Sequence, residues 1–506
     1  MAEKHGSSSL GVISRKFLIC LFTFVLALFI LSWFFVLRST SRRNFIDHGL
    51  LPVPLHSVID NGSSTQSLID NSIIPASGTR VRVPLEDIRE DETPEENVDT
   101  KDVKCNTRNE NRKDPLKVFM YDLPSEFHFE LLDWKSKGDN VWPDLRTKIP
   151  GYPGGLNLQH SIEYWLTLDL LASEIPAIPR AGSAIRVRNS SEADVIFVPF
   201  FSSLSYNRFS KVNPHEKKSK NKVLQEKLVR YVTSQREWKR SKGRDHVIMA
   251  HHPNSMLDAR MKLWPALFIL SDFGRYPPNV ANVDKDVIAP YKHVIKSYVD
   301  DSSTFDSRPT LLYFQGAIYR KDGGYARQEL FYLLKDEKDV HFQFGSVQKD
   351  GISKASQGMH TSKFCLNIAG DTPSSNRLFD AIASHCVPVI ISDDIELPYE
   401  DILDYSQFCI FVRTSDAIKE KFLIKLMRGI GKDEWTQMWR KLKEVEQLFE
   451  FRYPSKEGDA VQMIWQAVAR KVPAIRMKIN RSMRFARSIS RNNRDLRKIS
   501  APSNFW

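Results

Sequence analysis

Cysteine is scarce in this sequence, with only five among 506 residues. Cys20 lies in a long apolar segment, which leaves Cys105, Cys365, Cys386 and Cys409 for the rest of the chain. These four lack the Cys-x-x-Cys spacing of a zinc site, and they are too few for a disulfide-rich scaffold. Cys365 and Cys386 flank a predicted helix and could form a bridge, but buried thiols are the simpler prediction.

Charge, proline and glycine are all absent from residues 17–37, FLICLFTFVLALFILSWFFVL. At about 1.5 Å per residue, a helix of this length crosses the hydrocarbon core of a bilayer, which is about 30 Å thick. The run is longer than the core of a cleaved signal peptide, and Arg38 follows it directly. We therefore expect a signal anchor at 17–37 after a cytoplasmic tail at 1–16, with the remaining chain on the lumenal side.

Aromatic residues are few between positions 38 and 112, where Ser, Asn, Pro, Asp and Glu prevail. Such a segment has little surface to bury, so we expect a disordered or extended lumenal stem at 38–112. Asn61, Asn189 and Asn480 each begin an Asn-x-Ser sequon, as a lumenal glycoprotein would carry.

From residue 113 onward, short apolar runs alternate with amphipathic segments, a pattern that predicts an α/β fold. In the first half, 113–305, we expect strands at Val118–Tyr121, Val195–Val198, His246–Met249 and Leu267–Leu270. In the second half, 306–473, we expect strands at Leu311–Gln315, His341–Phe344, Phe364–Ile368, Val387–Ser392 and Phe408–Val412. Two α/β halves imply a cleft between them, and ligands of such sheets bind beyond the carboxyl ends of the strands.

The segment Ser362–Asp394 carries the clearest binding signal. A strand leads into a loop of small polar residues, Gly370–Ser375, and a helix then begins at Arg377. A helix N-terminus favours an anion, and the planar fork of Arg377 suits phosphate oxygens. Asp380 follows one turn later and could accept hydrogen bonds from a ribose diol. This predicts a nucleotide diphosphate site, with an ordinary surface pair between Arg377 and Asp380 as the alternative.

The same segment resembles the nucleotide-sugar region of the exostosin family, glycosyltransferase family 47. The family's pattern is matched by Ser362, Phe364, Cys365, Leu366, Gly370, Arg377, Asp380, Ala381 and Cys386–Val389. Further blocks match in the family's order: VFMYDLP at 118–124, EADVIFVP at 192–199, GRDH at 243–246, DVIAPY at 286–291 and RPTLLYFQG at 308–316. Within the family, GMHTSKF at 358–364 and Glu396–Pro398 are most similar to the plant arabinan arabinosyltransferase-like branch.

The resemblance implies a type II Golgi membrane enzyme of the GT-B fold, with two Rossmann-like domains facing a cleft. It implies inverting transfer from a UDP-sugar to a plant cell-wall polysaccharide, with arabinosyl transfer to pectic arabinan as one interpretation. Galactose, xylose or glucuronic acid on xyloglucan, xylan or another glycan stays open. A non-catalytic scaffold for a partner transferase also stays open, as does assembly into homo- or hetero-oligomers with other Golgi transferases.

The family's donor site can be carried over residue by residue. Asp380 would hold the ribose, and Arg377 with the loop of Gly370, Ser374 and Ser375 would hold the diphosphate. Arg320 and Lys321 would add positive charge there. GT-B enzymes stabilise a departing diphosphate with fixed cations or amide dipoles and without a metal, so the resemblance implies neither a metal nor another cofactor.

Inverting transfer also needs a base near the acceptor hydroxyl. Many relatives have an Asp where this chain has His251-His252-Pro253, so His252 becomes the candidate, with a merely packed or exposed histidine as the alternative. His160, Glu163 and Asp272 are further candidates.

Other function classes fit poorly. Asp272-Phe273-Gly274 lacks the glycine-rich and catalytic loops of a kinase, and no carboxylate pair of a glycosidase can be placed. The net charge is +12, and the tail at 474–506 is strongly basic between Arg476 and Lys498. A lumenal chain has no nucleic acid to bind, so this stretch is either a solvated helix face or a contact for acidic glycan or anionic lipid.

Overall fold

The computed structural model describes Leu26, Leu28 and residues 114–499, without 137, 275, 299, 321–323 and 346–349. Over 485–499 it describes only the helical backbone. Leu26 and Leu28 are helical and exposed; the rest of the predicted membrane span at 17–37, the tail at 1–16 and the stem at 38–112 lie outside the described residues. Within the part that is described, no helix combines the length and the apolar character needed to cross a bilayer.

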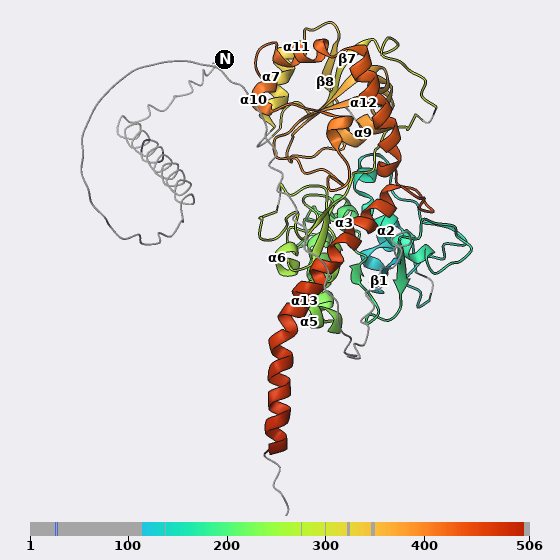
Figure 1. Cartoon of the computed structure of the whole chain (residues 1–506), viewed down its shortest axis with the longest axis vertical. Coiled ribbons are helices and arrows are strands. Elements are labelled where there is room, and N and C mark those ends of the chain that lie inside the picture. Colours follow the sequence, from blue (N-terminus) through green and yellow to red (C-terminus); the bar gives the residue numbers. More distant parts are fainter. Residues whose placement is uncertain are drawn as a thin grey trace, which may run out of the picture. The chain divides into compact units, whose positions relative to one another are not determined.

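The first half is built on a parallel sheet of six strands in the order β2-β1-β3-β4-β5-β6 (Figure 1). The strands are β1 (Leu116–Met120), β2 (Ala184–Val187), β3 (Val195–Val198), β4 (His246–Met249), β5 (Leu267–Leu270) and β6 (Val287–Ile288). Its helices include α2 (Ile162–Ala172), α3 (Ser202–Phe209), α4 (Lys220–Ser234), α5 (Arg236–Ser241) and α6 (Arg260–Leu263). The sequence predicted β3, β4 and β5 at these bounds, because all three are short, mostly apolar runs, and all three are buried along their whole length.

The second half is built on a parallel sheet of five strands in the order β11-β10-β9-β7-β8. The strands are β7 (Thr310–Gly316), β8 (Val340–Phe344), β9 (Ser362–Ile368), β10 (Val387–Ile391) and β11 (Ile410–Phe411). The helices are α7 (Tyr325–Leu334), α8 (Gly351–His360), α9 (Arg377–Ala383), α10 (Thr414–Ala417), α11 (Phe422–Gly429) and α12 (Lys432–Val445). The prediction of two α/β halves with parallel sheets is thus confirmed.

Alternation along the strands explains why helices cover both faces of the second sheet. Leu312, Phe314 and Phe364 share one core with apolar residues of α7, α11 and α12. Their neighbours Tyr313 and Cys365 belong instead to a smaller cluster with residues of α8 and α9. Each strand therefore buries side chains on both sides, as its apolar sequence requires.

Both sheets reverse their strand order next to their first strand. The second strand lies on one side of the first, and the third lies on the other, so the reversal falls between β1 and β3 and between β7 and β9. In parallel sheets of this kind, ligands bind beyond the carboxyl ends of the strands at that point. In the second sheet these ends are Gly316 and Ile368, and the loops that follow them carry the predicted donor site.

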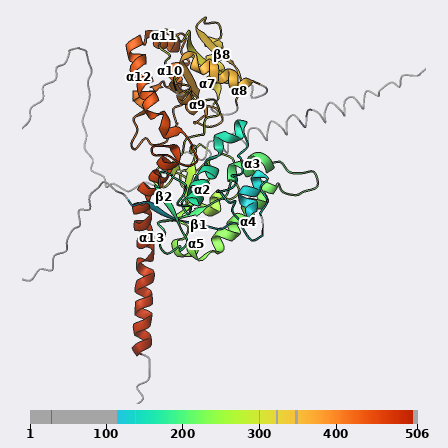
Figure 2. The same ribbon diagram turned by 90° about the vertical axis from the view of Figure 1, so that its right-hand side faces the viewer.

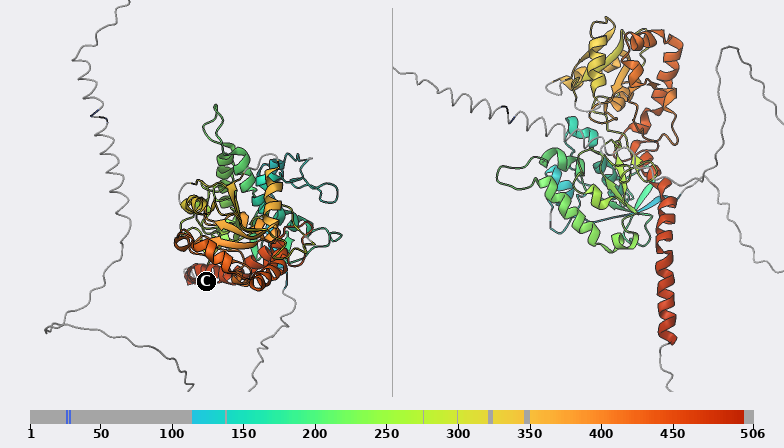
Figure 3. Two further views of the ribbon diagram at one scale, coloured as in Figure 1. Left: turned by 90° about the horizontal axis from the view of Figure 1, so that it is seen from above. Right: turned by 90° about the vertical axis from the view of Figure 1, so that its left-hand side faces the viewer.

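The last helix, α13 (Ala460–Ile499), returns the chain to the first sheet. Val461, Ile464, Trp465 and Val468 belong to the first half's core, and α13 contacts α2, β1 and β6. Figures 1 and 2 show this red helix running beside the strands of the first half, and Figure 3 shows it continuing beyond them. The predicted domain boundary at 473 thus falls inside one continuous helix, and the basic stretch is part of it.

Cys365 and Cys386 form a disulfide, so the preference for buried thiols at these positions was wrong. Cys365 lies on β9, and Cys386 directly precedes the neighbouring strand β10. Parallel pairing of the two strands brings the residues together, which the sequence separation of 21 does not reveal. Cys409 remains a buried thiol.

Candidate functional site

A cavity of about 500 Å³ lies between the two sheets, at the carboxyl ends of β7 and β9. From the second half it is lined by Arg320, Arg327, Gly370, Ser374, Ser375, Arg377 and Asp380, and from the first half by His160, His252 and Tyr291. Most of the predicted site residues therefore do come together. Lys321 lies outside the described residues, and Glu163 and Asp272 do not line this cavity.

Three guanidinium groups gather on the side of the cavity that the second half forms. Arg377 donates from Nε to the Gln315 carbonyl at 3.1 Å and from Nη1 to Ser375 Oγ at 3.0 Å. Arg327, which the sequence analysis missed, donates from Nε and Nη2 to the Ile368 carbonyl at 3.2 and 2.7 Å. Arg320 pairs with the exposed Asp371 at 3.0 Å.

Arg327 and Arg377 form no ion pair with any described residue. Burial, together with the positive charges of Arg377 and Arg320, lowers the pKa of Arg327 to about 9. Burial also lowers the pKa of Arg377 to about 10, and the longer-range charge of Asp380 offsets this only in part. Two desolvated cations side by side are unfavourable unless an anion joins them, so the site is electrostatically complementary to a diphosphate.

Glycine provides the space in which these side chains lie. A Cβ atom at Gly316 would stand 2.0 Å from Arg377 Nη2, and one at Gly370 would stand 2.7 Å from Arg327 Nη2. The role of Gly370 is therefore to let the Arg327 guanidinium lie against the backbone. Arg327 and Gly370 are far apart in sequence, so no local motif indicates that Arg327 belongs to this site.

The helix N-terminus contributes less than the sequence predicted. The amide of Leu378 donates to the Ser375 carbonyl, and the amides of Phe379 and Asp380 both donate to the Asn376 carbonyl. These three amides are therefore unavailable to a ligand, and helix α9 has only seven residues. The positive character of the site comes from arginine side chains instead.

Asp380 is only 5% exposed and already holds two partners. Its Oδ1 accepts from the Val294 amide at 2.8 Å, and its Oδ2 accepts from Asn376 Nδ2 at 2.7 Å. Burial raises its pKa to about 6, although these hydrogen bonds and His293 work in the opposite direction. Asp380 thus fastens α9 to the segment that joins the two halves.

The two loop serines have separate partners. Ser374 Oγ donates to Asp272 and also bonds the Tyr291 hydroxyl at 2.8 Å, which joins the donor loop to the first half. Ser375 Oγ accepts from Arg377 and so orients that guanidinium. Asp272 is occupied by this contact and by the Gly274 amide.

Two histidines, His160 and His252, line the opposite wall, and the fully buried His251 contacts His160. His160 Nδ1 lies 2.8 Å from His251 Nδ1, and the His160 ring centroid is 4.6 Å from that of His252 and 5.0 Å from that of Tyr291. Burial lowers the pKa of His251 to about 3 and that of His252 to about 4, and it lowers the pKa of His160 well below its usual value. All three imidazoles are neutral at physiological pH. Burial also raises the pKa of Glu163 to about 7.

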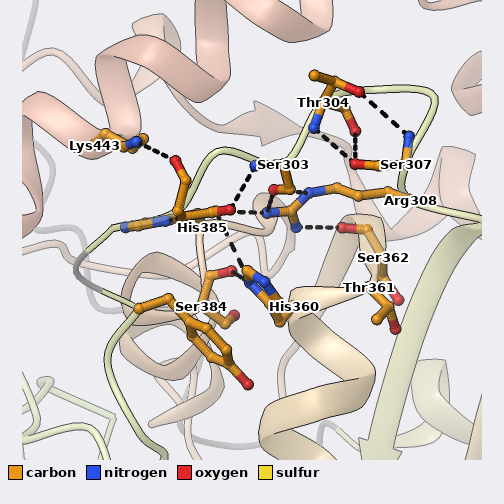
Figure 4. A network of polar contacts seen from close by, with 12 residues as sticks. Ser303, Thr304, Ser307, Arg308, His360, Thr361, Ser362, Ser384, His385 and Lys443 are labelled. Carbon is orange, nitrogen blue, oxygen red and sulfur yellow. Dashed lines mark hydrogen bonds and ion pairs between the residues drawn. The ribbon is translucent and has the colours of Figure 1, made fainter.

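A larger cavity, of about 770 Å³, lies beside the segment that joins the halves, but its charges are matched. Arg308 pairs with Asp301 at 3.0 Å, and His385 bonds Asp301 at 2.8 Å and Glu446 at 2.9 Å. Figure 4 shows His385 and Arg308 within this network. His385 has a φ of 55°, in the left-handed region that favours glycine.

Comparisons with known proteins show the family of this chain. The family model of the Exostosin GT47 domain matches residues 112–427. The probable arabinosyltransferase ARAD1 of Arabidopsis thaliana is 40% identical over 374 residues, which cover 73% of this chain and 81% of that protein. A probable glucuronosyltransferase 47 A of Physcomitrium patens is 25% identical over 71% of this chain and 76% of its own length. The chain therefore belongs to the exostosin family of glycosyltransferases, family 47.

Proposed function

We propose that this enzyme transfers a sugar from a UDP-sugar to a plant cell-wall polysaccharide with inversion, and that the two halves form a GT-B arrangement. The donor diphosphate would lie against Arg327 and Arg377, and the acceptor would enter from the histidine wall. The observation that carries the proposal is the pair of guanidinium groups beyond β7 and β9, of the buried Arg327 and the half-buried Arg377, which form no ion pair with a described residue. As the bond to the sugar breaks, negative charge grows on the diphosphate, and fixed cations stabilise it.

The remaining donor contacts follow from the same geometry. Arg320 stands at the rim of the cavity with its side chain 36% exposed, where it could exchange Asp371 for a phosphate oxygen. Asp380 would accept a ribose hydroxyl, while Gly370, Ser374 and Ser375 shape the loop. These groups supply the charge that a diphosphate requires, so the proposal needs no metal.

The sugar is proposed to be arabinose and the acceptor pectic arabinan. The support is the 40% identity to a probable arabinosyltransferase, against 25% and 24% to probable glucuronosyltransferases of Physcomitrium patens and Arabidopsis thaliana. The proposed contacts are to the nucleotide and not to the sugar, so they do not distinguish one UDP-sugar from another. UDP-sugars of galactose, xylose and glucuronic acid are therefore tested in the same assay.

We place the enzyme in the Golgi membrane as a single-pass type II protein, anchored by residues 17–37 and carrying its catalytic halves in the lumen. The uncharged run of 21 residues supports the anchor. The Cys365–Cys386 disulfide supports the lumen, because such bonds persist in oxidising compartments. Protease protection of an epitope added after position 506 tests this placement in sealed Golgi vesicles. Cleavage of the epitope without detergent would show that the C-terminus faces the cytoplasm.

The function is tested with the full-length chain in detergent micelles. Thermal unfolding is followed with UDP, UMP and each UDP-sugar, and transfer is followed with oligosaccharides of arabinan, xyloglucan and xylan. A ligand that binds only the native state raises the melting temperature. We expect UDP to stabilise more than UMP, since only UDP carries the second phosphate, and we expect transfer from UDP-arabinose to arabinan. Stabilisation by UDP without transfer from any UDP-sugar would favour a non-catalytic scaffold. No stabilisation by any of these ligands would refute the proposed donor site.

A further inference from the structure

We propose that Nε2 of His160 is the base that takes the proton from the acceptor hydroxyl, a role that rests on the transfer reaction proposed above. His252 is the residue that the sequence favoured, since it stands where many relatives have an Asp. The hydrogen bonds around the three histidines assign the free lone pair to His160 instead.

The assignment begins at a backbone carbonyl. His251 Nε2 lies 3.1 Å from the Ala289 oxygen, and a carbonyl oxygen can only accept. The proton of neutral His251 is therefore on Nε2, and its Nδ1 is an acceptor. His160 Nδ1 lies 2.8 Å from that Nδ1, so it must be the donor. Since neutral His160 carries only one ring proton, its Nε2 is left with an unshared lone pair.

Neutrality of these rings follows from their surroundings. His160 is 4% exposed and His251 is fully buried, and the groups packed around them are His252 and Tyr291. No described carboxylate pairs with either histidine, so no negative charge stabilises a buried imidazolium before substrate binds.

His252 has the opposite arrangement. Its Nδ1 accepts from the Asn254 amide at 3.1 Å, so its single proton lies on Nε2. A neutral His252 can donate a hydrogen bond into the cavity but has no free lone pair there. Glu163 accepts from the Ser203 amide at 2.7 Å, Asp272 accepts from Ser374, and neither lines the cavity. Among the base candidates, only His160 combines a free lone pair with a position on the cavity wall.

His160 also stands next to the donor loop. Its ring centroid is 5.0 Å from that of Tyr291, whose hydroxyl bonds Ser374 at 2.8 Å. In the reaction, the acceptor O–H proton moves to His160 Nε2 as the acceptor oxygen bonds to the anomeric carbon. The bond from that carbon to the phosphate oxygen breaks, and its electron pair leaves on UDP beside Arg377. Imidazolium at His160 then releases its proton to water.

The test compares His160→Gln, His160→Ala and His252→Gln in the full-length enzyme, with UDP-arabinose and arabinan oligosaccharides. Loss of a general base lowers kcat by about 10²- to 10⁴-fold. We expect such a loss in both His160 variants, an unchanged Kd for UDP, and a loss below about tenfold in His252→Gln. Imidazole added to His160→Ala should restore part of kcat, which a merely structural role of the ring would not allow.

A second measurement needs no turnover. Diethyl pyrocarbonate carbethoxylates unprotonated imidazole nitrogens, and peptide mapping locates the products. We expect modification at His160 and protection of His251 and His252, whose lone pairs are occupied. Modification at His252 without His160, or full transfer activity in His160→Gln, would overturn the assignment. Failure of the wild-type chain to bind UDP would instead refute the proposed function.

Discussion

Arg377→Met separates the electrostatics of the donor site from the stability of the fold. Methionine keeps much of the volume of the arginine stem but removes its charge. In the ligand-free protein this change deletes a half-buried cation that pairs with no described carboxylate. It also leaves the Gln315 carbonyl without this donor, at a cost of about 1 kcal/mol. Relief of repulsion with Arg327 offsets that cost, so we expect the free energy of unfolding to stay within about 1 kcal/mol of wild type.

Binding of UDP should change much more. At a UDP concentration of 100 times the wild-type Kd, binding stabilises the native state by about 2.7 kcal/mol. A hydrogen bond to a charged group is worth about 1.5–3 kcal/mol, so the variant should bind UDP about 10- to 150-fold more weakly. At the same UDP concentration the stabilisation then falls to between about 0.3 and 1.4 kcal/mol. Calorimetric titration gives the Kd, and urea unfolding with and without UDP gives the stabilisation.

Arg308→Met is the matched control, because Arg308 is a buried arginine of the same half but forms an ion pair with Asp301. Removing it leaves the Asp301 carboxylate, 2% exposed, without this cation. The free energy of unfolding should fall by about 3–5 kcal/mol, while the Kd for UDP stays unchanged. If Arg377→Met destabilises the fold as much as Arg308→Met and leaves UDP binding intact, the interpretation of unpaired cations as a diphosphate site is refuted.

Three further predictions test neighbouring features. Gly316→Ala should weaken UDP binding at least tenfold, because its Cβ would displace the adjacent guanidinium, whereas Gly429→Ala, whose Cβ meets nothing within 4 Å, should leave binding unchanged. Burial would lower the pKa of His385, but hydrogen bonds to two carboxylates raise it above its usual value. The stability that His385 contributes is therefore complete below the unfolded pKa of about 6.5 and is lost as the pH rises through the folded pKa. Urea unfolding at several pH values should show this loss in the wild type but not in His385→Gly. Replacing Cys365 and Cys386 with alanine should lower the free energy of unfolding by about 3 kcal/mol, given their separation of 21 residues, and peptide mapping without reductant should show the linkage.

The sequence by itself determined the class of fold and the position of the donor loop. Apolar runs such as Val195–Val198 and Val387–Ile391 are buried on both faces, so their composition alone identifies parallel strands. Short edge strands such as Val287–Ile288 escape this reasoning, because two residues hold no period. The motif around Arg377 and Asp380 lies within one short segment, so the sequence alone was enough to recognise it.

The tertiary structure decided which residues meet across the cavity. Arg327 lies on a helix with no motif of its own, and it reaches the site because β7 and β9 are neighbours. The choice between His160 and His252 depends on a carbonyl at Ala289 and an amide at Asn254, neither of which has a side-chain signature. A sequence records which groups can ionise or donate, whereas burial and hydrogen-bond partners, which set their charge and their free lone pairs, exist only once the chain has folded.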